Sequence, residues 1–105
     1  MVDQTIKKIE AQLASANVLL YMKGSPEHPQ CGFSAKAVQI LDASGCAYDT
    51  VDVLSNPDIR QALPQYSNWP TFPQLYIKGE LVGGSDIMAE LFEQGDLQTM
   101  VEEFK

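Results

Sequence analysis

The sequence predicts one α/β domain, built on a four-stranded mixed sheet flanked by helices, with an extra helix at the N-terminus. Short apolar runs typical of strands alternate with helical patterns through the first half of the chain. In the second half, Lys78-Gly79 separates two short apolar segments and predicts a β-hairpin. A chain of 105 residues, 45% of them hydrophobic, suits one compact domain, which we expect to span residues 1–105.

Residues 5–14 predict the N-terminal helix, because Ile6, Ile9 and Leu13 recur on one helical face. The run 18–22 is short and entirely apolar. A run of this length with no polar alternation is typical of a strand that is buried on both faces of a sheet. We therefore expect it to be a central strand.

A loop, a helix and a second strand are expected next. Residues 24–30 hold two prolines and one glycine, which predicts the loop. The helix is expected to begin at Cys31 or Gly32 and to end at Gly45. Its apolar stripe consists of Phe33, Ala37, Val38 and Leu41. Residues 48–54 then predict a strand parallel to the first, reached through a right-handed crossover.

The segment Asn56-Pro57-Asp58 predicts the start of another helix. It offers a capping amide, a proline at the first helical position and an acid near the positive end of the helix dipole. Pro64 is expected to kink or shorten this helix. The predicted inner face consists of Ile59, Leu63 and Tyr66.

The last third predicts the hairpin and two further helices. Strands over 74–77 and 80–82 flank the Lys78-Gly79 turn, and Gly83-Gly84 then leads into a helix. Gly95 is expected to end that helix, and Asp96 to cap a last one. The last helix carries Leu97, Met100, Val101 and Phe104 on one face. The complete order of elements is the layout of the thioredoxin fold with an added N-terminal helix.

Composition excludes several classes of protein. The net charge of -7 argues against a nucleic-acid surface, which needs a basic patch. No run approaches ~18 apolar residues, so we expect no membrane span. The N-terminal segment lacks the apolar core of a signal peptide. Two cysteines are too few for a disulfide scaffold or a zinc site, and they indicate a reducing compartment, which we take to be the cytoplasm.

Cys31 is the residue that points to chemistry. It lies where the loop after a central strand meets the start of a helix, and the exposed N–H groups there stabilise an anion. A thiolate at such a place has a lowered pKa and is a better nucleophile and metal ligand. The alternative is a buried cysteine that packs as a small hydrophobic residue. The neighbours Gln30 and Gly32 are poor core residues and favour an exposed thiol.

A dithiol redox site needs a second cysteine at C-x-x-C spacing, and here Cys31-Gly32-Phe33-Ser34 has a serine at that position. This motif resembles the C-G-F-S signature of monothiol glutaredoxins, in their single-domain bacterial form. Three further motifs match the same family in the same order, so that the resemblance covers almost the whole chain. These are Tyr21-Met22-Lys23-Gly24, Asn68-Trp69-Pro70-Thr71-Phe72-Pro73 and Gly83-Gly84.

The resemblance implies a thioredoxin-like fold and a glutathione site beside Cys31, which would be both the catalytic thiol and the metal ligand. The implied glutathione-binding residues are Lys23, Arg60, Phe72, Ser85 and Asp86. Lys23 and Arg60 would contact carboxylates, and Phe72, before a cis-proline, would pair its backbone with the cysteinyl part. The N-terminus of the helix at Ser85 and Asp86 would hold the γ-glutamyl end.

Other interpretations of these residues do not need a ligand. Lys23 and Arg60 would be solvated surface cations, Phe72-Pro73 a core turn, and the 83–86 junction a plain helix cap. Many relatives carry cysteine at the position of Ser85, so a redox role of that second thiol is absent here. Cys46 is interpreted as structural. His28 is interpreted as a solvated loop residue, with tuning of the Cys31 thiol or weak iron ligation as the alternative.

Two functions follow from the resemblance. The first is storage and transfer of a [2Fe-2S] cluster, bridged in a homodimer by Cys31 and glutathione from each side, with apo iron-sulfur proteins as acceptors and a BolA-like partner. The second is a glutathione-dependent thiol-disulfide oxidoreductase that acts on glutathione mixed disulfides by a monothiol route. The long loop 24–30 resembles the class that carries clusters and shows at most weak oxidoreductase activity, so the first is preferred.

Overall fold

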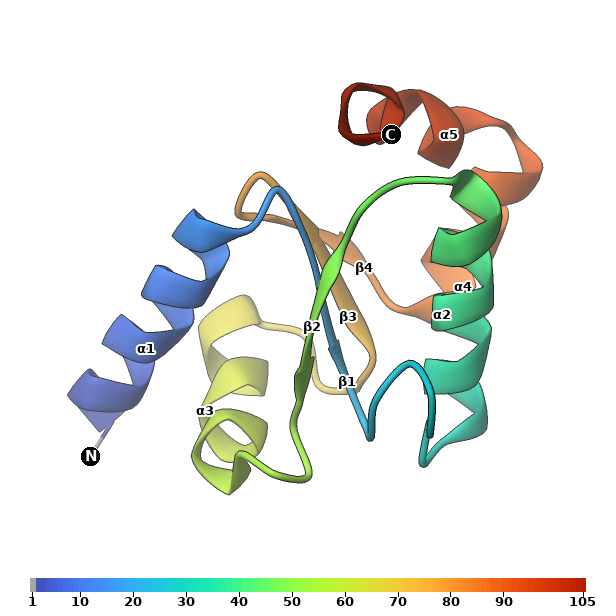
Figure 1. The fold of residues 1–105 in the computed structure, drawn as a ribbon. Coiled ribbons are helices and arrows are strands. Elements are labelled where there is room, and N and C mark those ends of the chain that lie inside the picture. The colour runs from blue at the N-terminus through green and yellow to red at the C-terminus, as the bar shows by residue number, and fades with distance from the viewer. Residues whose placement is uncertain (1) are drawn as a thin grey trace.

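The computed structural model describes residues 2–105 and shows a four-stranded sheet in the order β2-β1-β3-β4 (Figure 1). The strands are β1 (Val18–Met22), β2 (Asp49–Asp52), β3 (Gln74–Ile77) and β4 (Glu80–Gly83). Strand β1 is parallel to β2 and antiparallel to β3, and β3 is antiparallel to β4. The predicted mixed sheet, with a parallel pair followed by a hairpin, is confirmed.

Helices cover both faces of the sheet (Figure 1). Helices α1 (Val2–Ser15) and α3 (Pro57–Ser67) pack against each other on one face, and α2 (Gly32–Ser44) and α4 (Ser85–Glu93) on the other. Helix α5 (Asp96–Met100) and a 3-10 turn (Glu102–Phe104) follow on the α2/α4 side. In the described part of the chain, no helix has the length and apolar character needed to cross a bilayer.

Strand β1 is buried along its whole length, as predicted. Alternate side chains of a strand point to opposite faces of the sheet, so β1 contributes to two cores. Leu20 and Met22 pack on the α2/α4 side, whereas Leu19 and Tyr21 pack on the α1/α3 side. The carboxyl end of β1 is therefore the point where both helical layers approach the same strand.

Several predicted boundaries shift. Helix α1 begins earlier than residue 5, and β2 is shorter than 48–54. The side chain of Asn56 does not cap α3: its oxygen, the atom that a cap requires, accepts from Lys8 at 3.3 Å, and its nitrogen donates to the carbonyl oxygen of Asp52 at 2.8 Å. Pro64 lies inside α3, and the helix nevertheless continues to Ser67. Asp96 is the first residue of α5, not its cap, and Gly95 occupies the cap position with φ at 80°.

Three residues predicted to face the core are exposed. Phe33 is 61% exposed, Tyr66 40% and Met100 39%. Each lies at or next to one end of its helix. A helical stripe predicts which face points inward, but it does not predict how far along the helix the core extends.

Helix α5 provides a direct test of this boundary. Leu97 is fully buried, and Met100, one turn further on, is 39% exposed. We expect Leu97→Ala to lower the free energy of unfolding by about 2–5 kcal/mol, because it leaves a cavity. Met100→Ala should cost less than ~1 kcal/mol. Urea unfolding of both variants measures this, and equal losses would contradict the assignment of the inner face.

Candidate functional site

A pocket of about 640 Å³ lies beyond the carboxyl end of β1. All six residues singled out from the sequence line it, although they come from five separate segments of the chain. They are Lys23, Cys31, Arg60, Phe72, Ser85 and Asp86. Phe33 and Trp69 also line the pocket and were not predicted as site residues.

Cys31 is the N-cap residue of α2, with extended backbone angles of φ -156° and ψ 137°. Its carbonyl accepts the first helical hydrogen bond, from Ala35 N–H at 2.9 Å. The thiol makes no capping bond of standard geometry, yet the N–H of Ser34 stabilises its thiolate and is the largest cause of a lowered Cys31 pKa. The N–H of Phe33 and the charge of Lys23 lower it further, and partial desolvation opposes them.

Ser34 occupies the position of a resolving cysteine and is fully buried. Its hydroxyl oxygen accepts a hydrogen bond from the Lys23 backbone N–H at 3.1 Å, which joins the end of β1 to the first turn of α2. The same hydroxyl contributes to the lowered pKa of Cys31. Ser34 therefore holds the strand and the helix together and stabilises the thiolate, and it supplies no second thiol.

A second wall of the pocket is the segment before β3. The Phe72–Pro73 peptide bond is cis, as the resemblance implied. Within residues 2–105, the backbone N–H and C=O of Phe72 make no hydrogen bond. Phe72 lines the pocket, and unpaired backbone groups of this kind can bind a peptide by strand addition.

A buried glutamine holds this wall in place. Gln74 is fully buried, and its amide nitrogen donates to the carbonyl oxygens of Trp69 and Thr71 at 3.0 and 3.2 Å. The hydroxyl of Tyr76 donates to the Gln74 side-chain oxygen at 3.0 Å, which fixes the orientation of the amide. A buried polar group with all its bonds made is rigid, so the wall is preorganised.

The third side of the pocket is the N-terminus of α4, with Gly84 as the N-cap residue. The free N–H groups of this first turn, at Ser85 and Asp86, favour an anion. A Cβ at position 84 would lie 3.3 Å from the Pro73 carbonyl oxygen, so the junction is packed tightly against the wall. The buried indole N–H of Trp69 has no hydrogen-bond partner among the described residues and lies beside this junction.

Two cations complete the pocket. Lys23 follows β1, and Arg60 lies on the first turns of α3, exposed to solvent. Both line the same cavity as Cys31 and the α4 N-terminus. The site can therefore bind an extended ligand with a carboxylate at each end and a sulfur or peptide group in the middle.

Two residues that the sequence left open lie elsewhere. His28 is exposed in the loop and does not line the pocket. Cys46 is a free, buried cysteine in the α2/α4 core, and burial raises the pKa of its thiol. The structural interpretation of Cys46 agrees with this position.

Comparisons with known proteins agree with the fold and the motif. The family model described as glutaredoxin matches residues 18–82. Probable monothiol glutaredoxin GrlA of Legionella pneumophila is 66% identical over 83 residues, which are 79% of this chain and 93% of that protein. Glutaredoxin 4 of Escherichia coli K12 is 59% identical over 99 residues, or 94% and 86% of the two chains.

The solution structure of reduced poplar apo GrxS14 has the same fold, with a TM-score of 0.81 and 46% identity over 93% of this chain and 90% of that one. The fold is thus the thioredoxin-like fold of glutaredoxins, beginning with an N-terminal helix. This chain belongs to the glutaredoxin family, in its monothiol C-G-F-S branch.

The electrostatics of Cys31 can be tested by alkylation. We expect the pKa of its thiol to lie below the value of about 8.5 for a free cysteine. Lys23→Gln should raise this pKa only in part, because the Ser34 N–H remains. Lys36→Gln, on the exposed side of α2, is the matched control. The rate of reaction with iodoacetamide against pH, read for each cysteine by mass spectrometry, measures it. A pKa unchanged by Lys23→Gln would contradict a role for this cation.

Proposed function

We propose that this protein stores and transfers a [2Fe-2S] cluster, held between two copies of the chain by the Cys31 thiolates and by glutathione bound in each pocket. The observation that supports this most strongly is the convergence of one low-pKa thiol, two cations and a helix N-terminus around one pocket. The cluster is the cargo of the protein, and glutathione is its co-ligand.

Glutathione matches the pocket group by group. It has a carboxylate at each end and a thiol on its central residue. Lys23 and Arg60 suit the glycyl carboxylate, because Arg offers a planar fork of donors. The free N–H and C=O of Phe72 suit the cysteinyl backbone, and the α4 N-terminus at Ser85 and Asp86 suits the γ-glutamyl carboxylate. This placement directs the glutathione thiol toward the side of the pocket that holds Cys31.

The number of thiolates leads to a dimer. A [2Fe-2S] cluster is usually held by four thiolates. In residues 2–105, the pocket carries one thiol, and no group of three or more His, Cys, Asp or Glu side chains is arranged to hold a metal. One chain with one glutathione offers two thiolates, so two such units are needed. Phe33 is exposed beside Cys31 and would lie at the contact between the two chains.

A second candidate function uses the same thiol. The lowered pKa of Cys31 favours attack on the glutathione sulfur of a mixed disulfide, which forms a Cys31–glutathione disulfide and releases the protein thiolate. A second glutathione then attacks that disulfide, leaving as glutathione disulfide and restoring the Cys31 thiolate. Because Ser34 stands at the resolving position, the chain cannot form an internal disulfide there. The protein would be at most a weak enzyme of this kind.

The proposed partners follow from the proposed cargo. They are apo iron-sulfur proteins that accept the cluster and a BolA-like protein that shares it. We place the activity in the cytoplasm, because a reducing compartment keeps the Cys31 thiol free.

The role of Cys31 can be tested by cluster reconstitution. We expect Cys31→Ser to abolish the visible absorption that appears after anaerobic incubation with iron, sulfide and glutathione. Cys46→Ser should keep the absorption, because Cys46 is buried away from the pocket. Both variants should remain folded by circular dichroism. A Cys31→Ser protein that reconstitutes fully would contradict the assignment of Cys31 as the cluster ligand.

The oligomeric state of the protein distinguishes a cluster carrier from an oxidoreductase. If the cluster joins the chains, dimerisation should require iron, sulfide and glutathione together, by mass action. Sedimentation is expected to give a monomer without cluster, a dimer with it, and a monomer again after chelation. Arg60→Ala should weaken the dimer through glutathione, and the control Lys36→Ala should not. A stable dimer without cluster, or a monomer that carries one, would favour the oxidoreductase.

A further inference from the structure

The loop 24–30, which leads from β1 to Cys31, is tied mainly to itself. Ser25 and His28 exchange backbone hydrogen bonds at 3.3 and 3.0 Å, and Gln30 N–H donates to the Lys23 carbonyl at 2.9 Å. Gly24, with φ at 92°, forms a bridge with Pro29. The loop is therefore a closed unit whose position depends on how it is attached to the rest of the protein.

Apart from its chain connections to β1 and α2, the loop is tied to the rest of the described protein by one hydrogen bond. Among the described residues, the hydrogen bonds of 24–30 stay within 23–30 except one, from Gly24 N–H to Asp52 Oδ1 at 2.9 Å. Asp52 is the last residue of β2, beside the end of β1. The same oxygen accepts from Leu54 N–H at 2.9 Å, and Oδ2 accepts from the Ser55 hydroxyl at 2.9 Å. The Asp52 carboxylate is thus held by hydrogen bonds from Leu54 and Ser55, which follow it in the chain, as well as by the bond from the loop.

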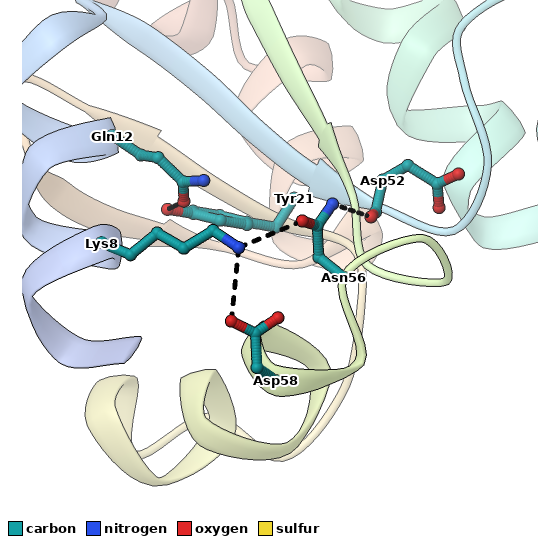
Figure 2. A network of polar contacts seen from close by, with 6 residues as sticks. All are labelled: Lys8, Gln12, Tyr21, Asp52, Asn56 and Asp58. Atoms are coloured by element: carbon teal, nitrogen blue, oxygen red, sulfur yellow. Dashed lines mark hydrogen bonds and ion pairs between the residues drawn. The ribbon is translucent and has the colours of Figure 1, made fainter. Parts of the chain in front are cut away.

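The carbonyl oxygen of Asp52 holds a second segment. It accepts the Asn56 side-chain amide at 2.8 Å, while the Asn56 side-chain oxygen accepts from Lys8 of α1 at 3.3 Å (Figure 2). The backbone carbonyl of Asn56 then accepts Arg60 N–H at 3.0 Å, in the first turn of α3. One residue is therefore bound to the segment that carries Lys23 and to the segment that carries Arg60.

We propose that Asp52 is a positioning residue of the pocket, whose carboxylate and carbonyl set the Lys23 loop and the start of α3 relative to each other. The two cations lie 37 positions apart in the sequence, and Asp52 is hydrogen-bonded to the segment that carries each of them, beside the β1–β2 pairing. This inference rests on the proposed function, because it takes glutathione as the ligand that both Lys23 and Arg60 contact. Asp52 itself does not line the pocket.

Geometry, and not the charge of Asp52, is what this role requires. The groups that shift the pKa of Cys31 are Ser34, Phe33 and Lys23, and Asp52 is not one of them. The pKa of Asp52 is lowered, first by the Gly24 N–H and then by the Leu54 N–H and Ser55. An asparagine keeps one side-chain oxygen as acceptor for Gly24 and Leu54, whereas an alanine keeps none. Comparing the two substitutions therefore distinguishes the effect of losing the hydrogen bonds from the effect of losing the charge.

The test compares Asp52→Ala, Asp52→Asn and the control Asp58→Ala in the full chain. Asp58 is a nearby carboxylate that pairs with Lys8 at 3.3 Å and does not line the pocket. Titration with reduced glutathione, followed by NMR, should show affinity about tenfold weaker for Asp52→Ala, which corresponds to ~1.4 kcal/mol for the lost hydrogen bonds. Asp52→Asn and Asp58→Ala should stay within about twofold of wild type.

A second readout does not need the ligand. Hydrogen exchange of the Gly24 amide should be at least about tenfold faster in Asp52→Ala and nearly unchanged in Asp52→Asn, while amides of β1 keep their protection. If glutathione does not bind the wild type, the proposed function fails, and the Gly24 amide still decides whether Asp52 anchors the loop. If wild type and Asp52→Ala bind glutathione equally, the positioning role is overturned.

The carbonyl of Asp52 can be tested alone if Asp52→Ala does not fold. Asn56→Ala removes the bond to the Asp52 carbonyl, together with the bond from Lys8, and leaves the Asp52 carboxylate in place. We expect weaker binding of glutathione with unchanged exchange at Gly24, because only the start of α3 is released. Binding equal to wild type in this variant would contradict the link to Arg60.

Discussion

The burial of β1 on both faces is the constraint on which the rest of the structure depends. A strand with no solvated face must be covered by a helical layer on each side, and both layers then reach its carboxyl end. Helix α2 begins there, and the N-terminus of α4 and the first turns of α3 line the same pocket. The ends of several helices therefore meet beyond one strand, which is where open α/β sheets bind ligands.

Hydrogen bonds from polar side chains convert this general location into a defined pocket. Gln74 holds the carbonyls of the wall before β3, and Asp52 holds the loop that leads to Cys31. Ser34 joins that loop's origin to α2. Each of the three lies at or close to the end of a strand or helix, where backbone groups leave regular pairing and need other partners. The walls of the pocket are thus set by polar contacts, and the apolar cores set only where the pocket lies.

Patterns in the local sequence were enough to predict the helices and strands. They failed where contacts between segments far apart in the sequence decide the structure. An apolar run predicts β1, and the Lys78-Gly79 turn, with φ of 53° and 80°, predicts the hairpin. Cys31 could be placed because a loop followed by a helical stripe indicates a helix start. The exposure of Phe33 could not be predicted, because it depends on what covers the end of α2. Asn56 has the pattern of a cap, but its side-chain oxygen accepts from Lys8 and its nitrogen donates to the Asp52 carbonyl.

The roles of Gln74 and Asp52 carry no sequence signal of their own. A glutamine at the start of a strand and an aspartate at the end of another look like ordinary surface residues. Their function exists only after folding places the segments 69–71 and 24–30 within reach of them. The resemblance to glutaredoxins pointed to the residues that line the pocket and are expected to contact a ligand, since most of them lie in recurring motifs. It did not name the residues that hold those motifs in place.

The single thiol of the pocket connects the chemistry to the assembly. A thiolate with a lowered pKa is suited both to attack a disulfide and to ligate iron, so the pKa of Cys31 cannot by itself choose between the two proposed functions. The number of thiolate ligands that each function needs distinguishes the two. Disulfide exchange through glutathione is complete with one chain, whereas a cluster with four thiolates is not. Because Ser34 removes the internal second thiol, the proposed cluster would take its remaining ligands from glutathione and from another chain, and measuring the oligomeric state therefore tests that proposal.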